Sequence, residues 1–360
     1  MKKIGILTSG GDCAGLNAAI RSVVLHANNH YGCQVYGIEN GTHGLIKRPA
    51  LAKRLNPQDM NDDLLRKGGT FLGTINKGNP FHYPIGDGMY RDITPIVIEG
   101  FHELGLEGLI GIGGDGSIGI LRRISRLGNI PFVAIPKTID DDIGGTEHAI
   151  GFLSALDVAT QALDRLHPTA ASHDRVMILE VMGRDAGHIA LNTGIAGGAD
   201  IILIPEILCK MDLIAQHLKK IMIGSKKSAL IVVSEAIAME SGRKATVRNE
   251  LGHVTRYAGI GDYLAKELSS RIDAEIRVTV LGHVQRGGQP CAQDRIWASA
   301  FGVHAVDVLM SRKSDRLVVW RNGRVLDVSI DEGIGLYKSV DTQGTLVKTA
   351  RALGVSFGDA

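Results

Sequence analysis

Short apolar runs rich in Val, Ile and Leu recur along the chain and alternate with segments of helical periodicity. Their apolar character is continuous rather than alternating, which is typical of strands buried on both faces of a parallel sheet. Apolar positions between the runs, such as Leu16, Val23 and Ala27, recur at helical spacing. The runs that we expect to be strands are Lys3 to Leu7, Val35 to Ile38, Gly108 to Ile112, Phe132 to Ile135, Val176 to Val181, Ile201 to Ile204, Leu230 to Val233 and Val278 to Leu281. The pattern predicts an α/β protein with doubly wound, mostly parallel sheets.

The length and composition narrow the class of protein. A chain of 360 residues exceeds the size that one hydrophobic core usually serves, so we expect two lobes with the active site in the cleft between them. The 40 Lys and Arg against 38 Asp and Glu give no electrostatic reason to bind nucleic acid or a membrane. No apolar run is long enough to span a bilayer, the first residues lack a signal peptide's apolar core, and the four cysteines lack paired spacing. We therefore expect a soluble cytoplasmic enzyme.

Three motifs that follow predicted strands carry residues suited to phosphate and metal chemistry. They are Thr8-Ser9-Gly10-Gly11-Asp12, Gly113-Gly114-Asp115-Gly116-Ser117 and Pro136-Lys137-Thr138-Ile139-Asp140-Asp141-Asp142. Paired glycines in the first motif allow backbone N–H groups to approach an anion at a helix N-terminus, although such a turn is more often plain turn geometry. In the second motif, Asp115 is well placed at a strand end to hold magnesium, and its alternative role is to cap the next helix.

The third motif is the most informative, because three successive carboxylates repel one another. A phosphoryl-transfer enzyme uses all of them, since one carboxylate takes the proton of the acceptor hydroxyl while the others organise metal and water. The alternative is a solvated acidic turn.

Basic residues near the ends of later predicted strands suit a sugar phosphate. They are Arg175, the run Met182-Gly183-Arg184, Arg277 and the run His283-Val284-Gln285-Arg286-Gly287-Gly288. Arginine binds phosphate oxygens in bidentate fashion, so one shared site explains this set better than several separate surface ion pairs.

In these motifs the chain resembles the 6-phosphofructokinase family, from residue 3 to about residue 310, with breaks around residues 76–92 and 236–274. The segments TSGGD, GGDGS, PKTIDDD, Ala171-Ser172-His173-Asp174-Arg175, MGR and GHVQRGG stand in the family's order. The resemblance implies Mg²⁺-dependent phosphoryl transfer from ATP to the 1-hydroxyl of D-fructose 6-phosphate, which gives fructose 1,6-bisphosphate in glycolysis. It also implies a homo-oligomer, usually a tetramer, whose subunits share active sites.

The resemblance assigns roles to individual residues. It implies that Asp140 is the general base, that Asp115 is a magnesium ligand, that Thr138 contacts the transferred phosphate, and that Asp142 helps to hold the metal and orient the base. Further catalytic positions are Arg184, Gly116 and Lys137. The implied donor-binding residues are Gly11, Lys77, Gly114, Asp115, Gly116, Ser117 and Gly119. The implied sugar-binding residues are Thr138, Ile139, Asp140, Arg175, Met182, Gly183, Arg184, Glu235, Arg277, His283, Val284, Gln285 and Arg286, with Arg175 and Arg277 reaching in from a neighbouring subunit.

Domains of the family are discontinuous. By resemblance, residues 1–151 and 286–312 would form the donor lobe, and residues 152–285 and 313–360 would form the fructose 6-phosphate lobe. Beyond residue 312, the runs Leu317 to Trp320 and Arg324 to Val328 flank Asn322-Gly323, which predicts a β-hairpin.

Departures from the family pattern leave the donor open between ATP and pyrophosphate. Gly116 is the choice of ATP-dependent members, whereas Lys137 is typical of pyrophosphate-dependent ones, and the pair resembles the mixed-substrate bacterial branch of the type A enzymes. Lys77 stands close to a position where many ATP-dependent members carry arginine. We expect ATP, because the hydrogen of Gly116 leaves room for an α-phosphate.

Other functions compete with this interpretation. The main alternative is a pyrophosphate-dependent, reversible phosphofructokinase. A nicotinamide or lipid kinase shares the GGDG motif but gives no use to the arginines and GHVQRGG. A catalytically silent, metabolite-sensing subunit is disfavoured by the intact Asp115, Thr138, Asp140 and Arg184. By resemblance the protein would be an allosteric enzyme, because the family has an inter-subunit effector site. That site is retained only in part, at Arg21, Asp200, Lys226 and Lys227.

Overall fold

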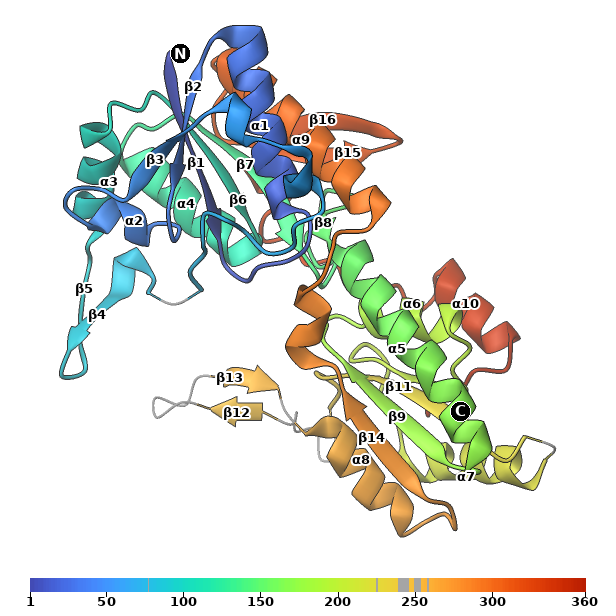
Figure 1. Cartoon of the computed structure of the whole chain (residues 1–360). Coiled ribbons are helices and arrows are strands. Elements are labelled where there is room, and N and C mark those ends of the chain that lie inside the picture. Colours follow the sequence, from blue (N-terminus) through green and yellow to red (C-terminus); the bar gives the residue numbers. More distant parts are fainter. Residues whose placement is uncertain (77, 225, 239–245, 249–253, 258) are drawn as a thin grey trace. The chain divides into compact units, whose positions relative to one another are not determined.

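The computed structural model describes residues 1–76, 78–224, 226–238, 246–248, 254–257 and 259–360 (Figure 1). The chain divides into two compact units. The first comprises Met1–Ile139, Ile143–Ser154 and Arg286–Tyr337, and the second comprises Asp140–Asp142, Ala155–Gln285 and Lys338–Ala360. Within the described ranges, none of the helices combines the length and apolarity that a bilayer-spanning segment needs.

The first unit is built on a mostly parallel sheet with the strand order β16-β15-β7-β6-β1-β2-β3, and β8 pairs with the end of β7. Its strands are β1 (Lys3–Ser9), β2 (Gln34–Ile38), β3 (Ala52–Leu55), β6 (Leu109–Gly113), β7 (Phe132–Thr138), β8 (Ile150–Gly151), β15 (Arg316–Arg321) and β16 (Arg324–Ser329). Only the outer pairs β2–β3 and β15–β16 are antiparallel among these strands. The prediction of a mostly parallel sheet is confirmed.

Helices cover both faces of this sheet. They are α1 (Leu16–Tyr31), α2 (His43–Ile46), α3 (Thr94–Glu103), α4 (Asp115–Leu127) and α9 (Ala292–Met310). Leu7 of β1 packs in a core with side chains of α2, α3 and α4, such as Phe101 and Leu121. Ile4 and Ile6, whose side chains point to the other face of the strand, are also fully buried. The continuous apolar run of β1 therefore corresponds to a strand buried on both faces, and the runs of β6 and β7 do the same.

The predicted hairpin after residue 312 is present and extends the first sheet. Asn322 and Gly323 both have positive φ angles, as a tight two-residue hairpin turn requires. Leu317 of β15 pairs in parallel with Ala134 of β7, and Leu317 and Val328 enter the core of the first unit. Residues 313–337 thus lie with the first unit, in contrast to the sequence-based boundary that assigned 313–360 to the other lobe. A hairpin signal predicts local pairing, but it does not say which sheet the hairpin joins.

The second unit has a parallel sheet with the strand order β10-β11-β9-β14. Its strands are β9 (Val176–Val181), β10 (Ile201–Leu203), β11 (Ala229–Ser234) and β14 (Ile276–Val280). The helices are α5 (Phe152–Ser172, whose first turn belongs to the first unit), α6 (His188–Ala196), α7 (Met211–Ile223), α8 (Ile260–Ser269) and α10 (Thr345–Ala352). Side chains of α7 and α8, including Leu218 and Leu264, form one core with the sheet.

Short elements complete the described part of the chain. They are the 3-10 turns η1 (Pro57–Asp59), η2 (Asp62–Leu65), η3 (Pro80–His82), η4 (Gly282–Arg286) and η5 (Ile330–Glu332), and the hairpins β4 (Tyr83–Gly86) with β5 (Met89–Arg91) and β12 (Thr246–Arg248) with β13 (Val254–Tyr257).

Candidate active site

The three sequence motifs meet at one edge of the first sheet. Strands β1, β6 and β7 are adjacent and parallel, so the loops that follow them leave the sheet side by side. Gly113 at the end of β6 pairs with Ser9 of β1 on one side and with Pro136 of β7 on the other. In open α/β sheets, ligands bind at the carboxyl ends of the strands. This edge is therefore the candidate site for the phosphoryl donor.

The loop after β1 is closely packed against two basic side chains. A Cβ atom at Gly10 would lie 2.7 Å from Ser117 Oγ, and one at Gly11 would lie 2.7 Å from Arg286 Nη1, so neither position accepts a side chain as it stands. Lys137 Nζ donates to the carbonyl oxygen of Gly11, and Arg286 Nη1 donates to that of Asp12 at 3.0 Å. Glycine at position 10, where φ is +86°, therefore suits both the packing and the turn, whereas a side chain at position 11 would have to displace the end of Arg286.

The N-terminus of α4 offers open space and has no side-chain cap. A Cβ atom at Gly116 or Gly119 would meet no atom within 4 Å. The cap residue is Gly114, and no side chain caps the helix. Asp115 lies inside the first turn, and its Oδ1 accepts a hydrogen bond of 2.7 Å from the backbone N–H of Gly335. Asp115 is therefore not a simple helix cap, and the backbone N–H groups of this turn are available to an anion.

The acidic loop after β7 is not a solvated turn. Asp140 and Asp142 are only 8% and 7% exposed. Asp141 adopts a φ of +55°, which is uncommon for a residue other than glycine. Lys338 Nζ lies 2.8 Å from Asp141 Oδ2, and the N–H of Lys338 donates to the carbonyl oxygen of Asp142 at 3.0 Å. A buried loop with a cationic partner is what a functional set of carboxylates requires.

The second unit presents its own polar edge, where Glu235 is central. Glu235 follows β11, and its Oε1 accepts a hydrogen bond of 3.1 Å from the N–H of Arg184, which follows β9. Burial raises the pKa of Glu235 to about 7, the negative charges of Asp140 and Glu180 also raise it, and the backbone N–H groups of Arg184 and Gly183 lower it. A carboxyl group with a pKa near neutrality can exchange both protonation states at physiological pH.

The segments MGR and GHVQ are joined at the same edge. The N–H of Met182 donates to Gln285 Oε1 at 2.7 Å, and Gln285 is only 2% exposed. Gly183 has a φ of +152° and Arg184 a φ of +52°, so the chain turns sharply after β9. His283 and Val284 belong to η4, which follows β14. Within the second unit, the structure thus brings together Met182, Gly183, Arg184, Glu235 and Gln285.

Arg175 and Arg277 do not lie with this group. Arg175 precedes β9 and Arg277 is near the start of β14, so both are at the amino ends of the strands. Seven residues of extended chain separate Arg175 from Met182, which is roughly 20 Å. Both arginines pair with Glu275, and Arg175 Nε is 2.5 Å from Glu275 Oε2. These hydrogen bonds and charges, that of Arg175 first, lower the pKa of Glu275. Within one chain, these two arginines cannot reach the same ligand as Arg184.

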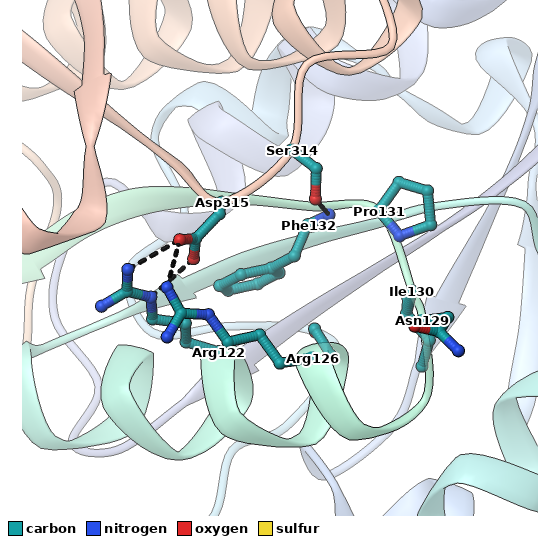
Figure 2. A pocket seen from close by; sticks show the side chains of 9 residues that line it. Arg122, Arg126, Asn129, Ile130, Pro131, Phe132, Ser314 and Asp315 are labelled. Carbon is teal, nitrogen blue, oxygen red and sulfur yellow. Dashed lines mark hydrogen bonds and ion pairs between the residues drawn. The ribbon is translucent and has the colours of Figure 1, made fainter.

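A pocket of about 360 Å³ lies at the other end of α4 (Figure 2). It is lined by Arg122, Ser125, Arg126, Asn129, Ile130, Pro131, Phe132, Ser314 and Asp315. Its two arginines are paired with Asp315, and the pocket borders Phe132 at the amino end of β7. The pocket is therefore remote from the motifs at the carboxyl edge of the sheet, and we assign it no part in the site.

Comparison with known proteins identifies the family. The model of the family described as phosphofructokinase matches residues 3–309. The chain belongs to the phosphofructokinase family. It is 57% identical to ATP-dependent 6-phosphofructokinase 1 of Nostoc sp. (strain PCC 7120 / SAG 25.82 / UTEX 2576) and 55% identical to ATP-dependent 6-phosphofructokinase 1 of Synechocystis sp. (strain ATCC 27184 / PCC 6803 / Kazusa). The first alignment covers 99% of both chains, and the second covers 100% of this chain and 99% of its relative.

A solved structure supports the same fold. The pyrophosphate-dependent phosphofructokinase from Nitrosospira multiformis matches with a TM-score of 0.81 and 20% identity, over 99% of this chain and 92% of that chain. At this identity the likeness shows the fold alone. The family resemblance and the α/β fold expected from the sequence are thus confirmed.

Two residues that the motifs of a phosphofructokinase did not reveal contribute to the site. Lys338 lies beyond the family match, 197 positions from its partner Asp141, and no local signal marks it. Asp294 is fully buried in the first turn of α9 and accepts hydrogen bonds from the N–H of Gly151 at 3.0 Å and from the N–H of Ser154 at 2.9 Å. It thereby fixes the junction between β8 and α5. Lys77, expected to bind the donor, lies outside the described residues.

Proposed function

We propose that this chain is an ATP-dependent 6-phosphofructokinase. It transfers the terminal phosphoryl group of ATP to the 1-hydroxyl of D-fructose 6-phosphate and forms fructose 1,6-bisphosphate, a step of glycolysis in the cytoplasm. The observation that carries the proposal is the whole-length identity of 57% and 55% to two relatives named ATP-dependent 6-phosphofructokinase. The carboxyl edge of the first sheet supports it, because its groups suit phosphates and a divalent cation.

The donor phosphates would lie over the first turn of α4 and the loop after β1. The open space at Gly116 and Gly119 leaves room for them, and the N–H groups at the helix N-terminus favour their charge. Lys137, which holds the carbonyl oxygen of Gly11, places a cation beside the same loop. Gly114 and Ser117 complete the proposed donor contacts.

The carboxylates fit a site for Mg²⁺ of the kind that relies on substrate phosphates. Among the described residues, no group of three or more His, Cys, Asp and Glu could hold a metal ion by itself. Mg²⁺ commonly uses one or two carboxylates with phosphate oxygens and water. Asp115 would bind it, with help from Asp142. When bound, the ion would neutralise charge on the phosphates during transfer.

The chain's own residues would carry the proton and position the sugar. Asp140 would accept the proton of the 1-hydroxyl as the attack on the terminal phosphate begins. Thr138 and Arg184 would bind the transferred group, and Ile139 would help to form the sugar site. The hydroxyls of the sugar would meet Met182, Gly183, Glu235, His283, Val284, Gln285 and Arg286.

The sugar 6-phosphate would require a second subunit. Arg175 and Arg277 lie near the amino ends of β9 and β14, where they could serve the site of a neighbouring chain. We therefore propose a homo-oligomer, specifically a tetramer, with shared active sites.

Initial rates test the proposed function. Purified protein is assayed with fructose 6-phosphate and Mg²⁺, with ATP, ADP or pyrophosphate as donor. We expect ATP to give the largest kcat/KM, and we expect Asp140→Asn to lower kcat by roughly 10² to 10⁴-fold while fructose 6-phosphate binding changes much less.

The same assay separates the alternatives. Lys137 favours a pyrophosphate-dependent enzyme as second candidate, and a larger kcat/KM with pyrophosphate would select it. Absence of turnover with every donor would contradict both enzymes and favour a metabolite-sensing subunit. Near-normal turnover of Asp140→Asn would remove Asp140 as the base.

A further inference from the structure

The C-terminal residues 329–340, here called the strap, run from the end of β16 past the carboxylates of the proposed active site. They lie beyond residue 309, where the family match ends. The strap begins at Ser329, whose side chain forms a capping box with Glu332 around η5. Its later contacts fall on Asp115 and on the loop from Asp141 to Gly144.

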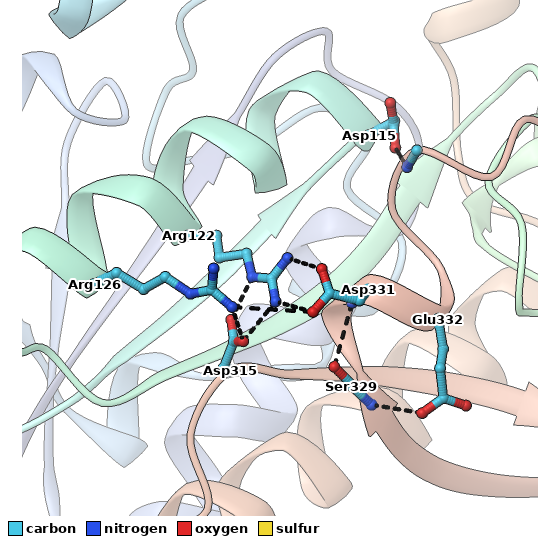
Figure 3. A network of polar contacts seen from close by, with 8 residues as sticks. Asp115, Arg122, Arg126, Asp315, Ser329, Asp331 and Glu332 are labelled. Carbon is cyan, nitrogen blue, oxygen red and sulfur yellow. Dashed lines mark hydrogen bonds and ion pairs between the residues drawn. The ribbon is translucent and has the colours of Figure 1, made fainter.

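The start of the strap is fixed to the middle of α4. Figure 3 shows Arg122 between Asp315 and Asp331, with Arg126 beside Asp315. Arg122 donates to both oxygens of Asp315 at 2.6 Å and to Asp331 Oδ2 at 2.7 Å. The side chain of Arg122 is only 13% exposed, and its bonds to Asp331 and Asp315 raise its pKa. Partly buried, bidentate pairs of this kind are the strong ones among protein ion pairs.

Four residues after Asp331, the strap reaches the N-terminal turn of the same helix. The N–H of Gly335 donates to Asp115 Oδ1 at 2.7 Å, a contact between residues 220 positions apart. A backbone N–H fixed at this distance selects one orientation of the Asp115 carboxylate. Because the strap is anchored on Arg122 of α4, the donor and the acceptor are held by one helix.

The strap then runs beside the acidic loop and pairs with it. In the first unit, the N–H of Gly144 donates to Leu336 O at 2.8 Å, and Ile143 forms an isolated antiparallel bridge with Tyr337. In the second unit, Lys338 binds the Asp141 carboxylate and the carbonyl oxygen of Asp142.

The far end of the strap is tethered inside the second unit. His188 Nε2 donates to the carbonyl oxygen of Lys338 at 3.0 Å, and the N–H of Val340 donates to Glu206 Oε1 at 2.9 Å. Glu206 Oε1 also accepts from the N–H of Gly187 at 3.0 Å, so the tether is attached to the start of α6.

We propose that the strap is a positioning device for phosphoryl transfer, in which Gly335 orients Asp115 and Lys338 holds the Asp140–Asp142 loop in its reactive arrangement. Three adjacent carboxylates repel one another, and Lys338 places a positive charge on the middle one. The left-handed backbone of Asp141 needs the same support, because such a conformation persists only when its surroundings fix it. Lys338 touches no reacting atom in this scheme and acts through Asp141. The inference rests on the proposed function for the roles of Asp115 and Asp140.

The experiment compares Lys338→Met, Lys338→Arg and the matched control Lys348→Met, which changes an exposed lysine of α10 in the same tail. We expect Lys338→Met to lower kcat about tenfold, with KM for fructose 6-phosphate changed less than about threefold. Lys338→Arg should restore most of the loss, since it keeps the charge, and Lys348→Met should match the wild type. Hydrogen exchange of the unliganded protein should be faster over residues 139–146 in Lys338→Met alone, because the loop loses its ion pair to the strap and the Leu336 carbonyl that accepts from the Gly144 amide is held less firmly beside it.

The outcomes of this comparison support or contradict the proposed role of the strap. If Lys338→Met changes neither kcat nor hydrogen exchange, the strap does not position the carboxylates. If the wild type has no activity with any donor, the proposed function fails, and the exchange data still decide whether the strap holds the loop. If Lys338→Met does not fold, Asp331→Asn replaces it, since Asp331 is 71% exposed. That change should speed exchange of the Gly335 amide, and an unaltered rate overturns the strap.

Discussion

The carboxyl ends of β1, β6 and β7 in the first unit and those of β9, β11 and β14 in the second both carry polar loops, but the groups they present differ. The first edge offers mainly backbone: glycines at positions 10, 11, 116 and 119, the N-terminus of α4 and the packed Lys137. The second edge offers side chains, with Glu235 and Gln285 fixed by backbone N–H groups. Backbone donors bind any phosphate that fits, whereas fixed side chains reject a ligand that leaves them unpaired. The difference suits a phosphoryl donor that is recognised by the shape of its phosphates and an acceptor sugar that is recognised through its hydroxyl groups.

Among the predictions that contrast the two edges, the largest effect concerns Arg175 and Arg277, the arginines that lie away from the second edge. Arg175→Ala should raise KM for fructose 6-phosphate by about 10 to 100-fold, because a charge-assisted phosphate contact is lost. The change should hardly alter kcat. Initial rates measure this effect, and Arg271→Ala, which removes a comparably exposed arginine of the same unit, serves as the control.

Subunit mixing sharpens this test. In a hybrid of one Arg175→Ala chain and one Asp140→Asn chain, each subunit lacks one of the two side chains. One of the two shared sites nevertheless combines an intact Asp140 with an intact Arg175. The assay uses fructose 6-phosphate well below its KM for Arg175→Ala, so that neither parent protein exceeds roughly a tenth of wild-type activity. If the sites are shared across a two-fold interface, random mixing should then recover about a quarter of wild-type activity. Exchange of subunits without any recovery would mean that each site is built from one chain.

A smaller effect is expected at the first edge from Gly116→Asp. The new carboxylate would fill the space above α4 and repel the α-phosphate of ATP, which should lower kcat/KM for ATP at least about tenfold, or 1.4 kcal/mol. Pyrophosphate activity should suffer less. Gly116→Ala separates volume from charge, since a Cβ at this position meets no atom within 4 Å. Full ATP activity of Gly116→Asp would remove Gly116 as the determinant of the donor.

The smallest expected effect is on stability and comes from Glu235. Burial raises the pKa of Glu235 in the folded protein to about 7, above its ordinary value of 4.5. Between these values the folded state binds more protons than the unfolded state, so the stability contributed by Glu235 is complete below pH 4.5 and is lost as the pH rises toward 7. Glu235→Gln cannot lose a proton. Between pH 5 and 8, the Tm of the wild type should therefore fall by about 2 to 4 °C more than that of the variant. Equal pH dependence of the two Tm values would contradict the shifted pKa.

The amino-acid sequence by itself determined the fold class and the members of the site that stand in continuous motifs. Buried parallel strands require continuous apolar runs, and a phosphate-binding loop requires glycines and carboxylates directly after a strand. Both features occupy short continuous stretches, so they can be recognised in the sequence alone. The runs at Lys3, Gly108 and Phe132 became adjacent strands, and the three motifs that follow them share one edge.

Only the tertiary structure decided which distant residues complete these local signals. The pairing of Lys338 with Asp141 and of Gly335 with Asp115 joins positions 197 and 220 apart, and a lone lysine or glycine carries no pattern that names its partner. The sequence predicted the hairpin of β15 and β16, but it did not predict that the hairpin would pair with β7. Any exposed strand edge of matching length can accept a hairpin. Burial decided the charge state of Glu235, and burial is a property of the packed chain rather than of the residue.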